Sequence, residues 1–284
     1  MNYKELAERL RKAESSRVQI GRLTDEFPEM TVADAYQIQL ENVAYRQAQG
    51  QKLIGMKIGI TSAAMQKMLN VDVPDYGHLF DNMLLPEGTP CRISQMIQPK
   101  VEGELSFCLK KDLKGPGVTI ADVYEATSYV VPSLEIVDSR IKDWKIKLQD
   151  TVADNGSAGR FVVGGRMTPI EAVDMRLTGM TLEKNGELIN SGTTAEVGGN
   201  PAATVACLAN MLSEFGIGLK AGSIVMAGAL TGMIPVENGD VVTASFCGMG
   251  SVSVKFVDST QKNQVLHFGH LPKLEIKWRG RTDK

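Results

Sequence analysis

Histidine is scarce in this sequence, and the scarcity limits the chemistry that the chain can perform. Only three histidines, His78, His267 and His270, occur among its 284 residues. A histidine-rich metal site or a Ser-His-Asp triad is therefore poorly supplied. We expect general acid–base work to fall mostly to carboxylates, lysines or a metal-bound water.

Cysteines are also few, and no long apolar run is present. Cys91, Cys108, Cys207 and Cys247 share no CxxC spacing, which is typical of buried free thiols in a reducing compartment. The N-terminal segment MNYKELAERLRKAESS is charged and lacks the apolar core of a signal peptide. No stretch approaches the length that spans a bilayer. The sequence thus predicts a cytoplasmic protein.

The charge balance gives no sign of a polyanionic partner. Lysine and arginine number 31, aspartate and glutamate number 33, and aromatic residues make up 6% of the chain. Nucleic acids and anionic membranes attract basic surfaces, and unpaired bases stack on aromatic side chains. We therefore expect neither nucleic acid nor membrane as a partner.

The beginning of the chain has the pattern of helices. Charged segments with spaced apolar residues predict helices over 3–14, 32–49 and 62–70. Thr31 is a fitting cap for the second of these, and Gly50 would end it. Residues 1–82 are therefore expected to form a helical N-terminal part.

From residue 83 onward, short apolar runs are bounded by Gly, Pro, Asn and Asp, which is typical of strands. The predicted strands cover 104–110, 128–138, 160–165, 180–189, 223–230, 240–248 and 251–257. KNGE at 184–187 fits a hairpin turn, and NPAATVACLANMLSE predicts one helix over 200–214. We expect an α+β fold, with a β-rich catalytic domain over 83–257 and a C-terminal tail over 258–284.

The segment PKVEGELSF contains the strongest candidates for chemistry. Glu102 and Glu104 are two residues apart on a predicted strand, so both side chains leave it on the same face. Neighbouring carboxylates repel one another unless a cation lies between them, and hard divalent ions such as Mg²⁺ or Mn²⁺ prefer oxygen ligands. Taken alone, the two glutamates also fit an acidic pair that faces solvent.

Glu135 strengthens the metal interpretation. It lies within SYVVPSLEIVDSR, an otherwise apolar run of the kind that a buried strand shows. Ionised carboxylates are rarely left without a partner in such places. Three glutamates on neighbouring strands would form a facial triad with open positions for substrate. Asp138, three residues further on, could support this triad or pair with Arg140.

Lys57 and Asp75 are candidates for proton transfer. Lys57 lies among apolar residues between Gly55 and Gly59. A lysine in such a setting can bind a carboxylate or act as an acid–base group, although it could also extend to solvent from a strand edge. Asp75 follows a proline in PDYGHL and could face a pocket or be an ordinary turn aspartate.

Two polar loops offer further groups. Asp154, Asn155 and Ser157 in DTVADNGSAGR could line a polar site, although the Asn-Gly step fits a turn equally well. In AGALTG, backbone amides and the Thr231 hydroxyl could hold an oxyanion or a carboxylate. No Gly-Lys-Ser or Gly-Lys-Thr follows, so this loop is not a nucleotide-binding P-loop.

Taken in order, several segments resemble one family. They are KIGITSAAMQKML, VPDYG, IQPKVEGELSF, KKDLKGPGVT, VPSLEIVDSRIKDWKIKLQDTVADN, EKNGELINSG and GMGSVSVKF. These segments are similar to the 2-hydroxypenta-2,4-dienoate (2-oxopent-4-enoate) hydratases and the related 4-oxalocrotonate decarboxylases, both of the fumarylacetoacetate-hydrolase-like superfamily. The resemblance covers roughly residues 5–257. It implies a mixed β-roll with a small helical N-terminal part, a homo-oligomer, and a role in the meta-cleavage route of aromatic breakdown.

The resemblance also implies roles for individual residues. Glu102, Glu104 and Glu135 match the metal-ligand positions, for Mg²⁺ or Mn²⁺. Lys57 matches the active-site lysine, and Asp75 lies at the PD(F/Y)G motif of the hydratases. The substrate is expected to be a small 2-oxo acid.

Three residues are expected to contact this substrate: Ser157, Arg160 and Thr231. Arg160 stands where the hydratases usually carry a smaller or apolar residue, and an arginine there would suit a dicarboxylate. GRLTDEFPEMTVADAY and RFVVGGRMT also look more like decarboxylases, whereas Asp75 and KIKLQDTVADN look like hydratases.

The resemblance favours hydration of 2-hydroxypenta-2,4-dienoate to 4-hydroxy-2-oxopentanoate. Decarboxylation of 4-oxalocrotonate (2-oxohex-3-enedioate) is the alternative. Two further readings stay open: a catalytically weak partner in a complex of the hydratase with the decarboxylase, and a C–C hydrolase of the wider superfamily. The hydrolase is less supported, because no His-Glu dyad is apparent near the metal segment.

Overall fold

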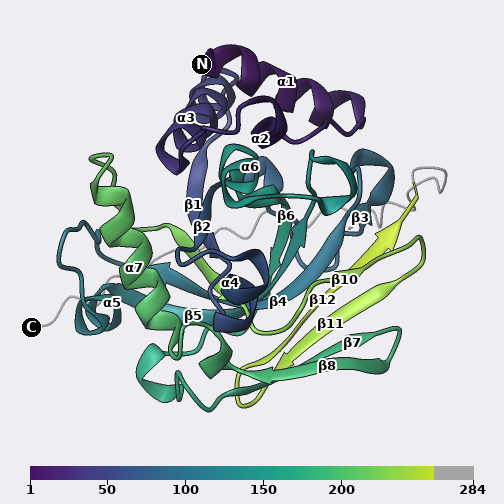
Figure 1. Cartoon of the computed structure of the whole chain (residues 1–284). Helices are drawn as coiled ribbons and strands as arrows, with labels where there is room; N and C mark the ends of the chain where they lie inside the picture. The colour runs from purple at the N-terminus through teal and green to yellow at the C-terminus, as the bar shows by residue number, and fades with distance from the viewer. Residues whose placement is uncertain (259–284) are drawn as a thin grey trace, which may run out of the picture.

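A rolled β-sheet forms the centre of the molecule in this computed structural model, which describes residues 1–258 without the side chains of Met68 and Leu69 (Figure 1). The sheet has seven strands in the order β2-β1-β9-β4-β5-β6, with β10 paired to β4. Its strands are β1 (Leu53–Gly59), β2 (Asp75–Phe80), β4 (Lys100–Leu109), β5 (Thr127–Val137), β6 (Ala158–Val163), β9 (Ile224–Ala229) and β10 (Ile234–Pro235). Apart from the parallel pair β1–β9, its neighbours are antiparallel.

The two edges of this sheet approach each other. Leu84, just after β2, forms a bridge with Phe161 of β6, and the Leu85 amide donates to the Phe161 carbonyl oxygen at 2.8 Å. Leu79 of β2, Phe161 of β6 and Met226 of β9 belong to one buried apolar cluster. The face that carries these side chains is therefore the inside of the roll.

A second, five-stranded sheet packs against the outer face of the roll and lies at the lower right of Figure 1. Its order is β3-β12-β11-β7-β8, with β3 (Cys91–Arg92), β7 (Gly179–Lys184), β8 (Glu187–Thr193), β11 (Val241–Phe246) and β12 (Gly250–Val257). Asn185 and Gly186 both have positive φ, of 57° and 82°. The hairpin expected at KNGE is confirmed, because a type I′ turn requires this conformation at both central residues.

The helices lie in two groups. Helices α1 (Tyr3–Ser16), α2 (Leu23–Glu26) and α3 (Val32–Ala48) gather at one end of the molecule, above α6 (Leu148–Ala153) (Figure 1). Helices α5 (Ile120–Ala126) and α7 (Pro201–Ser213) pack together elsewhere, and α4 (Ala63–Leu69) follows β1. None of the helices within residues 1–258 has the length and apolar character that a bilayer crossing requires.

The expected α+β fold is confirmed, with one correction for residues 1–82. This range holds the predicted helices, but it also supplies β1 and β2 to the main sheet. Lys57 lies within β1 and His78 within β2, and these polar residues interrupt the apolar pattern from which strands are predicted. The domain boundary at 82 stays a prediction, and the predicted tail over 258–284 lies outside the described residues except for Asp258.

A buried polar contact ties α3 to β2. His78 Nδ1 lies 2.7 Å from Gln39 Oε1. The Gln39 amide nitrogen donates to the carbonyl oxygens of Tyr76 and Val152, so the Gln39 oxygen must accept a hydrogen bond from the N–H of His78. Burial lowers the pKa of His78 to about 4. The imidazole is therefore neutral and carries its proton on Nδ1.

We expect this histidine to make stability depend on pH. Below pH 6.5, the ordinary pKa of histidine, His78 becomes protonated in the unfolded chain but stays neutral in the folded protein. The free energy of unfolding therefore falls as the pH drops towards 4. The loss at pH 5 should be roughly 2 kcal/mol relative to pH 8. Urea unfolding of the wild type and of His78→Gln at both pH values measures it. An equal pH dependence in the two proteins would contradict the assignment.

Candidate metal centre

Three glutamates converge inside the roll. Strand β4 presents Glu102 and Glu104 on one face, and the β4–β5 register pairs Glu102 directly with Glu135. One carboxylate oxygen from each residue lies within 4.8 Å of the others. Glu104 and Glu135 are buried, each only 1% exposed. The strand alternation read from the sequence and the pairing of the two strands together produce this cluster.

Such a cluster is electrostatically unfavourable by itself. Burial, followed by repulsion from Glu135, raises the pKa of Glu102 to about 8. The pKa of Glu104 is raised well above its ordinary value by the same two causes, and burial raises the pKa of Glu135. Both Glu135 oxygens are buried without a hydrogen-bond partner in the described part of the chain. An all-oxygen donor set with unsatisfied carboxylate atoms fits a hard divalent cation.

Lys57 and Asp75 lie beside the cluster. Lys57 Nζ is 3.6 Å from Asp75 Oδ1 and 3.8 Å from Glu135 Oε1. Burial acts to lower the pKa of Lys57, but the surrounding carboxylates, Asp75 first, outweigh it and raise the pKa. The lysine is therefore a charged ammonium. The Thr151 hydroxyl of α6 donates to Asp75 Oδ2 at 2.7 Å, so Oδ1, which has no hydrogen-bond partner, is left on the side of Lys57.

A left-handed turn covers the lysine. Asn155, Gly156 and Ser157 have φ values of 58°, 60° and 54°. The Asn155 side chain accepts from the His78 amide at 2.7 Å and donates to the His78 carbonyl oxygen at 2.9 Å. A Cβ on Gly156 would lie 2.3 Å from Lys57 Cε. Only glycine leaves room for the lysine here.

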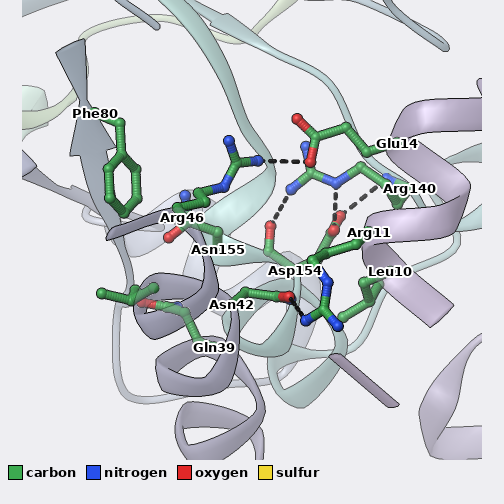
Figure 2. A pocket seen from close by; sticks show the side chains of 11 residues that line it. Leu10, Arg11, Glu14, Gln39, Asn42, Arg46, Phe80, Arg140, Asp154 and Asn155 are labelled. Atoms are coloured by element: carbon green, nitrogen blue, oxygen red, sulfur yellow. Dashed lines mark hydrogen bonds and ion pairs between the residues drawn. The ribbon is translucent and has the colours of Figure 1, made fainter. Parts of the chain in front are cut away.

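Arg140 binds Asp154, the residue that precedes this turn, as Figure 2 shows. Its guanidinium donates to the carboxylate and to the backbone oxygen of Asp154, and to the carbonyl oxygens of Asp138 and Ala158. The Arg140 partner is thus Asp154, and within the described residues the expected side-chain pair with Asp138 does not form. The Asp138 carboxylate instead accepts from the backbone amides at Ile97 and Gln98.

Unpartnered polar atoms concentrate around this centre. Among the described residues, buried side-chain oxygens without a hydrogen-bond partner include those of Asp75 and Glu135, of Thr61 beside Gly228, and of Ser157 in the turn over Lys57. The Thr231 hydroxyl, after β9, also has no partner among these residues. Buried polar groups are normally satisfied, so a group of exceptions indicates a place where a ligand completes the bonding.

Comparison with known proteins places the chain in a family. The family model described as the C-terminal part of fumarylacetoacetate (FAA) hydrolase matches residues 46–257. The chain belongs to this fumarylacetoacetate hydrolase family. The mixed β-roll expected from the sequence is therefore confirmed.

Relatives in the family carry two activities in their names. The chain is 47% identical to a 2-hydroxyhexa-2,4-dienoate hydratase from Comamonas testosteroni, over 88% of this chain and 96% of the relative. It is 42% identical to a 4-oxalocrotonate decarboxylase from Pseudomonas sp. strain CF600, over 89% and 96%. Among solved structures, the 4-oxalocrotonate decarboxylase from Pseudomonas putida G7, complexed with magnesium and adipate, has a TM-score of 0.88 and 43% identity. That match covers 90% of this chain and 97% of the other.

Arg160 does not join the centre of this family member. It pairs with Ile136 in the β5–β6 register, whereas its neighbour Phe161 pairs with Glu135. Because strand side chains alternate, Arg160 leaves the sheet on the face opposite Glu135. It lines a separate cavity of about 610 Å³ that includes Arg17 and Gln95. The expected contact of Arg160 with a substrate at the three glutamates is therefore wrong, because the side chains of Arg160 and Glu135 point to opposite faces of the sheet.

The sequence did not predict Thr61 as a residue of this site. This residue is 7% exposed and its hydroxyl has no partner. A Cβ on Gly228 would lie 2.2 Å from Thr61 Oγ1, and the Gly228 amide donates to Glu104 Oε2 at 3.0 Å. A hydroxyl in the segment KIGITS was the available signal, but nothing local indicated its direction.

Replacing Glu104 by Gln should separate metal binding from folding. In the metal-free protein we expect equal or higher stability, because one of three buried carboxylates is removed. Mn²⁺ at 100 times its Kd should stabilise the wild type by about 2.7 kcal/mol and the variant much less. Thermal unfolding with and without Mn²⁺ measures both effects. Glu187→Gln, at an exposed position on β8, is the control, and full Mn²⁺ stabilisation of Glu104→Gln would exclude Glu104 as a ligand.

Gly156→Ala should displace Lys57. The substitution combines a positive φ with a collision against Lys57, so we expect a loss of about 1–3 kcal/mol of stability and of metal-dependent turnover. Gly186→Ala is a matched control, because φ is +82° there but nothing lies within 4 Å of the added carbon. Urea unfolding and turnover are the measurements. Equal turnover in the two variants would show that the turn does not position the lysine.

Proposed function

We propose that the chain is a metal-dependent lyase that hydrates 2-hydroxypenta-2,4-dienoate to 4-hydroxy-2-oxopentanoate. The observation that carries the proposal is the buried Lys57–Asp75 pair beside the cluster of Glu102, Glu104 and Glu135. Relatives named as hydratases of closely similar dienoates, at 43–50% identity, support it. The three glutamates would hold Mg²⁺ or Mn²⁺, which would supply Lewis-acid stabilisation of the negative charge that develops on the 2-oxygen of the substrate.

The protein's own groups would move the protons. Hydration removes the proton of the 2-hydroxyl, adds one proton at C5, and then adds the hydroxyl of water at C4 and its proton at C3. Asp75 Oδ1 has no hydrogen-bond partner and suits the role of proton acceptor, while the Lys57 ammonium suits that of donor. The Thr151 hydroxyl fixes the Asp75 carboxylate for this purpose. Ser157 and Thr231 would donate hydrogen bonds to substrate oxygens.

Two features favour hydration over decarboxylation. The second carboxylate of 4-oxalocrotonate would enter a site that already holds Asp75 and three glutamates, and like charges repel one another in a buried site. Arg160, the cation that could have balanced it, lies on the other face of the sheet. The decarboxylase stays the second candidate, because a protein of that name matches with a TM-score of 0.88.

We further propose that the chain forms a homo-oligomer, with a complex of hydratase and decarboxylase as an extension of that idea. Large apolar side chains at the surface support this: Met167 is 64% exposed, Leu177 73% and Leu188 62%. Contact with a second subunit would remove such side chains from water, which is favourable.

An assay with both substrates tests the proposal. With Mg²⁺ or Mn²⁺ present, we expect the ultraviolet band of the dienoate to disappear as water adds across it. Release of CO₂ from 4-oxalocrotonate without dienoate hydration would instead establish the decarboxylase. Inertness towards both substrates would favour a non-catalytic binding partner.

Asp75→Asn should lower hydration about 100-fold, because a general acid–base group typically contributes 10²–10⁴-fold. Stabilisation by Mn²⁺ should be unchanged, because Asp75 is not among the three clustered glutamates. Asp72→Asn, at an exposed carboxylate three residues away, serves as the control. Steady-state kinetics and thermal unfolding report the two effects, and a fully active Asp75→Asn protein would remove Asp75 from the mechanism.

A further inference from the structure

We propose that Thr61 is a specificity-determining residue whose hydroxyl binds the 1-carboxylate of the substrate. The inference rests on the proposed function, because it assigns a contact to the 2-oxo acid at the same centre. Four observations carry it: an unpartnered hydroxyl, its place beside Glu104, the backbone that holds it there, and the charge of the site.

The Thr61 hydroxyl is buried without a partner. The residue is only 7% exposed, and Oγ1 makes no hydrogen bond with any residue of the range 1–258 that the structure describes. A hydroxyl taken out of water and left unbonded destabilises a protein, so such groups are rare unless something else binds them. Thr61 therefore offers a free donor inside the molecule.

This donor lies at the Glu104 side of the carboxylate cluster. Gly228 contacts both groups: its amide binds Glu104 Oε2 at 3.0 Å, and a Cβ on it would lie 2.2 Å from Thr61 Oγ1. Gly228 has a φ of +117°, which side chains rarely adopt. A side chain at this position would collide with Thr61, so glycine lets the hydroxyl pack on the backbone that binds Glu104.

The backbone is strained where it presents Thr61. Ile60 has a φ of +57°, a conformation that is a true outlier for a β-branched residue. It is held by the Gln66 side chain, which donates to the Ile60 carbonyl oxygen at 3.0 Å. The Gly198 amide donates to the Thr61 carbonyl oxygen at 3.2 Å. Strain that the surroundings maintain in this way is typical of binding sites.

The charge of the site explains why a neutral donor is needed. Glu102, Glu104, Glu135 and Asp75 place four carboxylates at this site. Lys57 Nζ lies within 4 Å of two of them, Asp75 and Glu135, and the positive charge of Lys100 also acts on Glu102. A substrate carboxylate at this place requires hydrogen-bond donors that add no negative charge. The Thr61 hydroxyl is such a donor, and a site built around it rejects analogues that lack the matching oxygen.

Binding of pyruvate, a 2-oxo acid without the diene, to the Mn²⁺-loaded full-length protein tests the proposal by calorimetry. We expect Thr61→Val to weaken pyruvate binding about tenfold, because a hydrogen bond to a charged group is lost. Thr61→Ser, which keeps the hydroxyl, should stay within about threefold of the wild type. The Mn²⁺ affinity should be unchanged in both variants.

Thr168→Val is the matched control. Thr168 also has a buried hydroxyl without a partner among the described residues. It pairs with Val130 near the start of β5, whereas Glu135 lies near the end of that strand. Its replacement should leave pyruvate binding unchanged. Because Thr61→Val removes an unsatisfied group and keeps the shape of the side chain, we expect it to fold, and Thr61→Ala provides a second hydroxyl deletion if it does not.

The outcomes are distinct. If wild type and Thr61→Val bind pyruvate equally, the role of Thr61 is overturned while the metal-dependent function stands. The same holds if the two hydroxyl deletions weaken Mn²⁺ binding as much as pyruvate binding, because the effect would then be structural. If the wild type binds no Mn²⁺, the proposed function and this inference both fall.

Discussion

Repulsion within a cluster of three carboxylates, two of them buried, is the constraint on which the rest of this structure depends. One carboxylate oxygen from each of Glu102, Glu104 and Glu135 lies within 4.8 Å of the others inside a roll. Burial raises the pKa of all three, and repulsion from Glu135 raises the pKa of Glu102 and Glu104 further. An arrangement of this kind persists only where a cation compensates it. Lys57 supplies one such charge, and the unbonded oxygens of Glu135 leave room for a divalent ion.

The helices above the sheet contribute to this centre, both those of the N-terminal part and α6. Thr151 of α6 fixes the Asp75 carboxylate, and Arg140 holds the turn at Asn155–Ser157 that packs on Lys57. The Gln39–His78 contact joins α3 to the strand that carries Asp75. Glu14 of α1 and Arg46 of α3 form an ion pair beside Arg140 (Figure 2), so these helices pack near the arginine that holds the turn.

The choice of reaction lies with residues around the cluster. Relatives with 47% and 42% identity carry the names of a hydratase and of a decarboxylase, so overall similarity does not separate the two. The three glutamates suit any reaction that develops negative charge on a 2-oxygen. Asp75, held by Thr151 and directed at Lys57, adds a group that can accept a proton, and this is what favours the addition of water.

The sequence determined what depends on short-range pattern. Helix caps, the Asn185–Gly186 turn and the shared face of Glu102 and Glu104 all follow from local geometry, and the predictions made from them agree with the fold. Tertiary structure decided which faces meet. Strand pairing turned Arg160 away from the centre. The left-handed Ile60 precedes Thr61, whose hydroxyl packs on Gly228 beside Glu104. Side-chain direction across strands is set by register and by single φ angles, and neither is encoded in the spacing of residues along one segment.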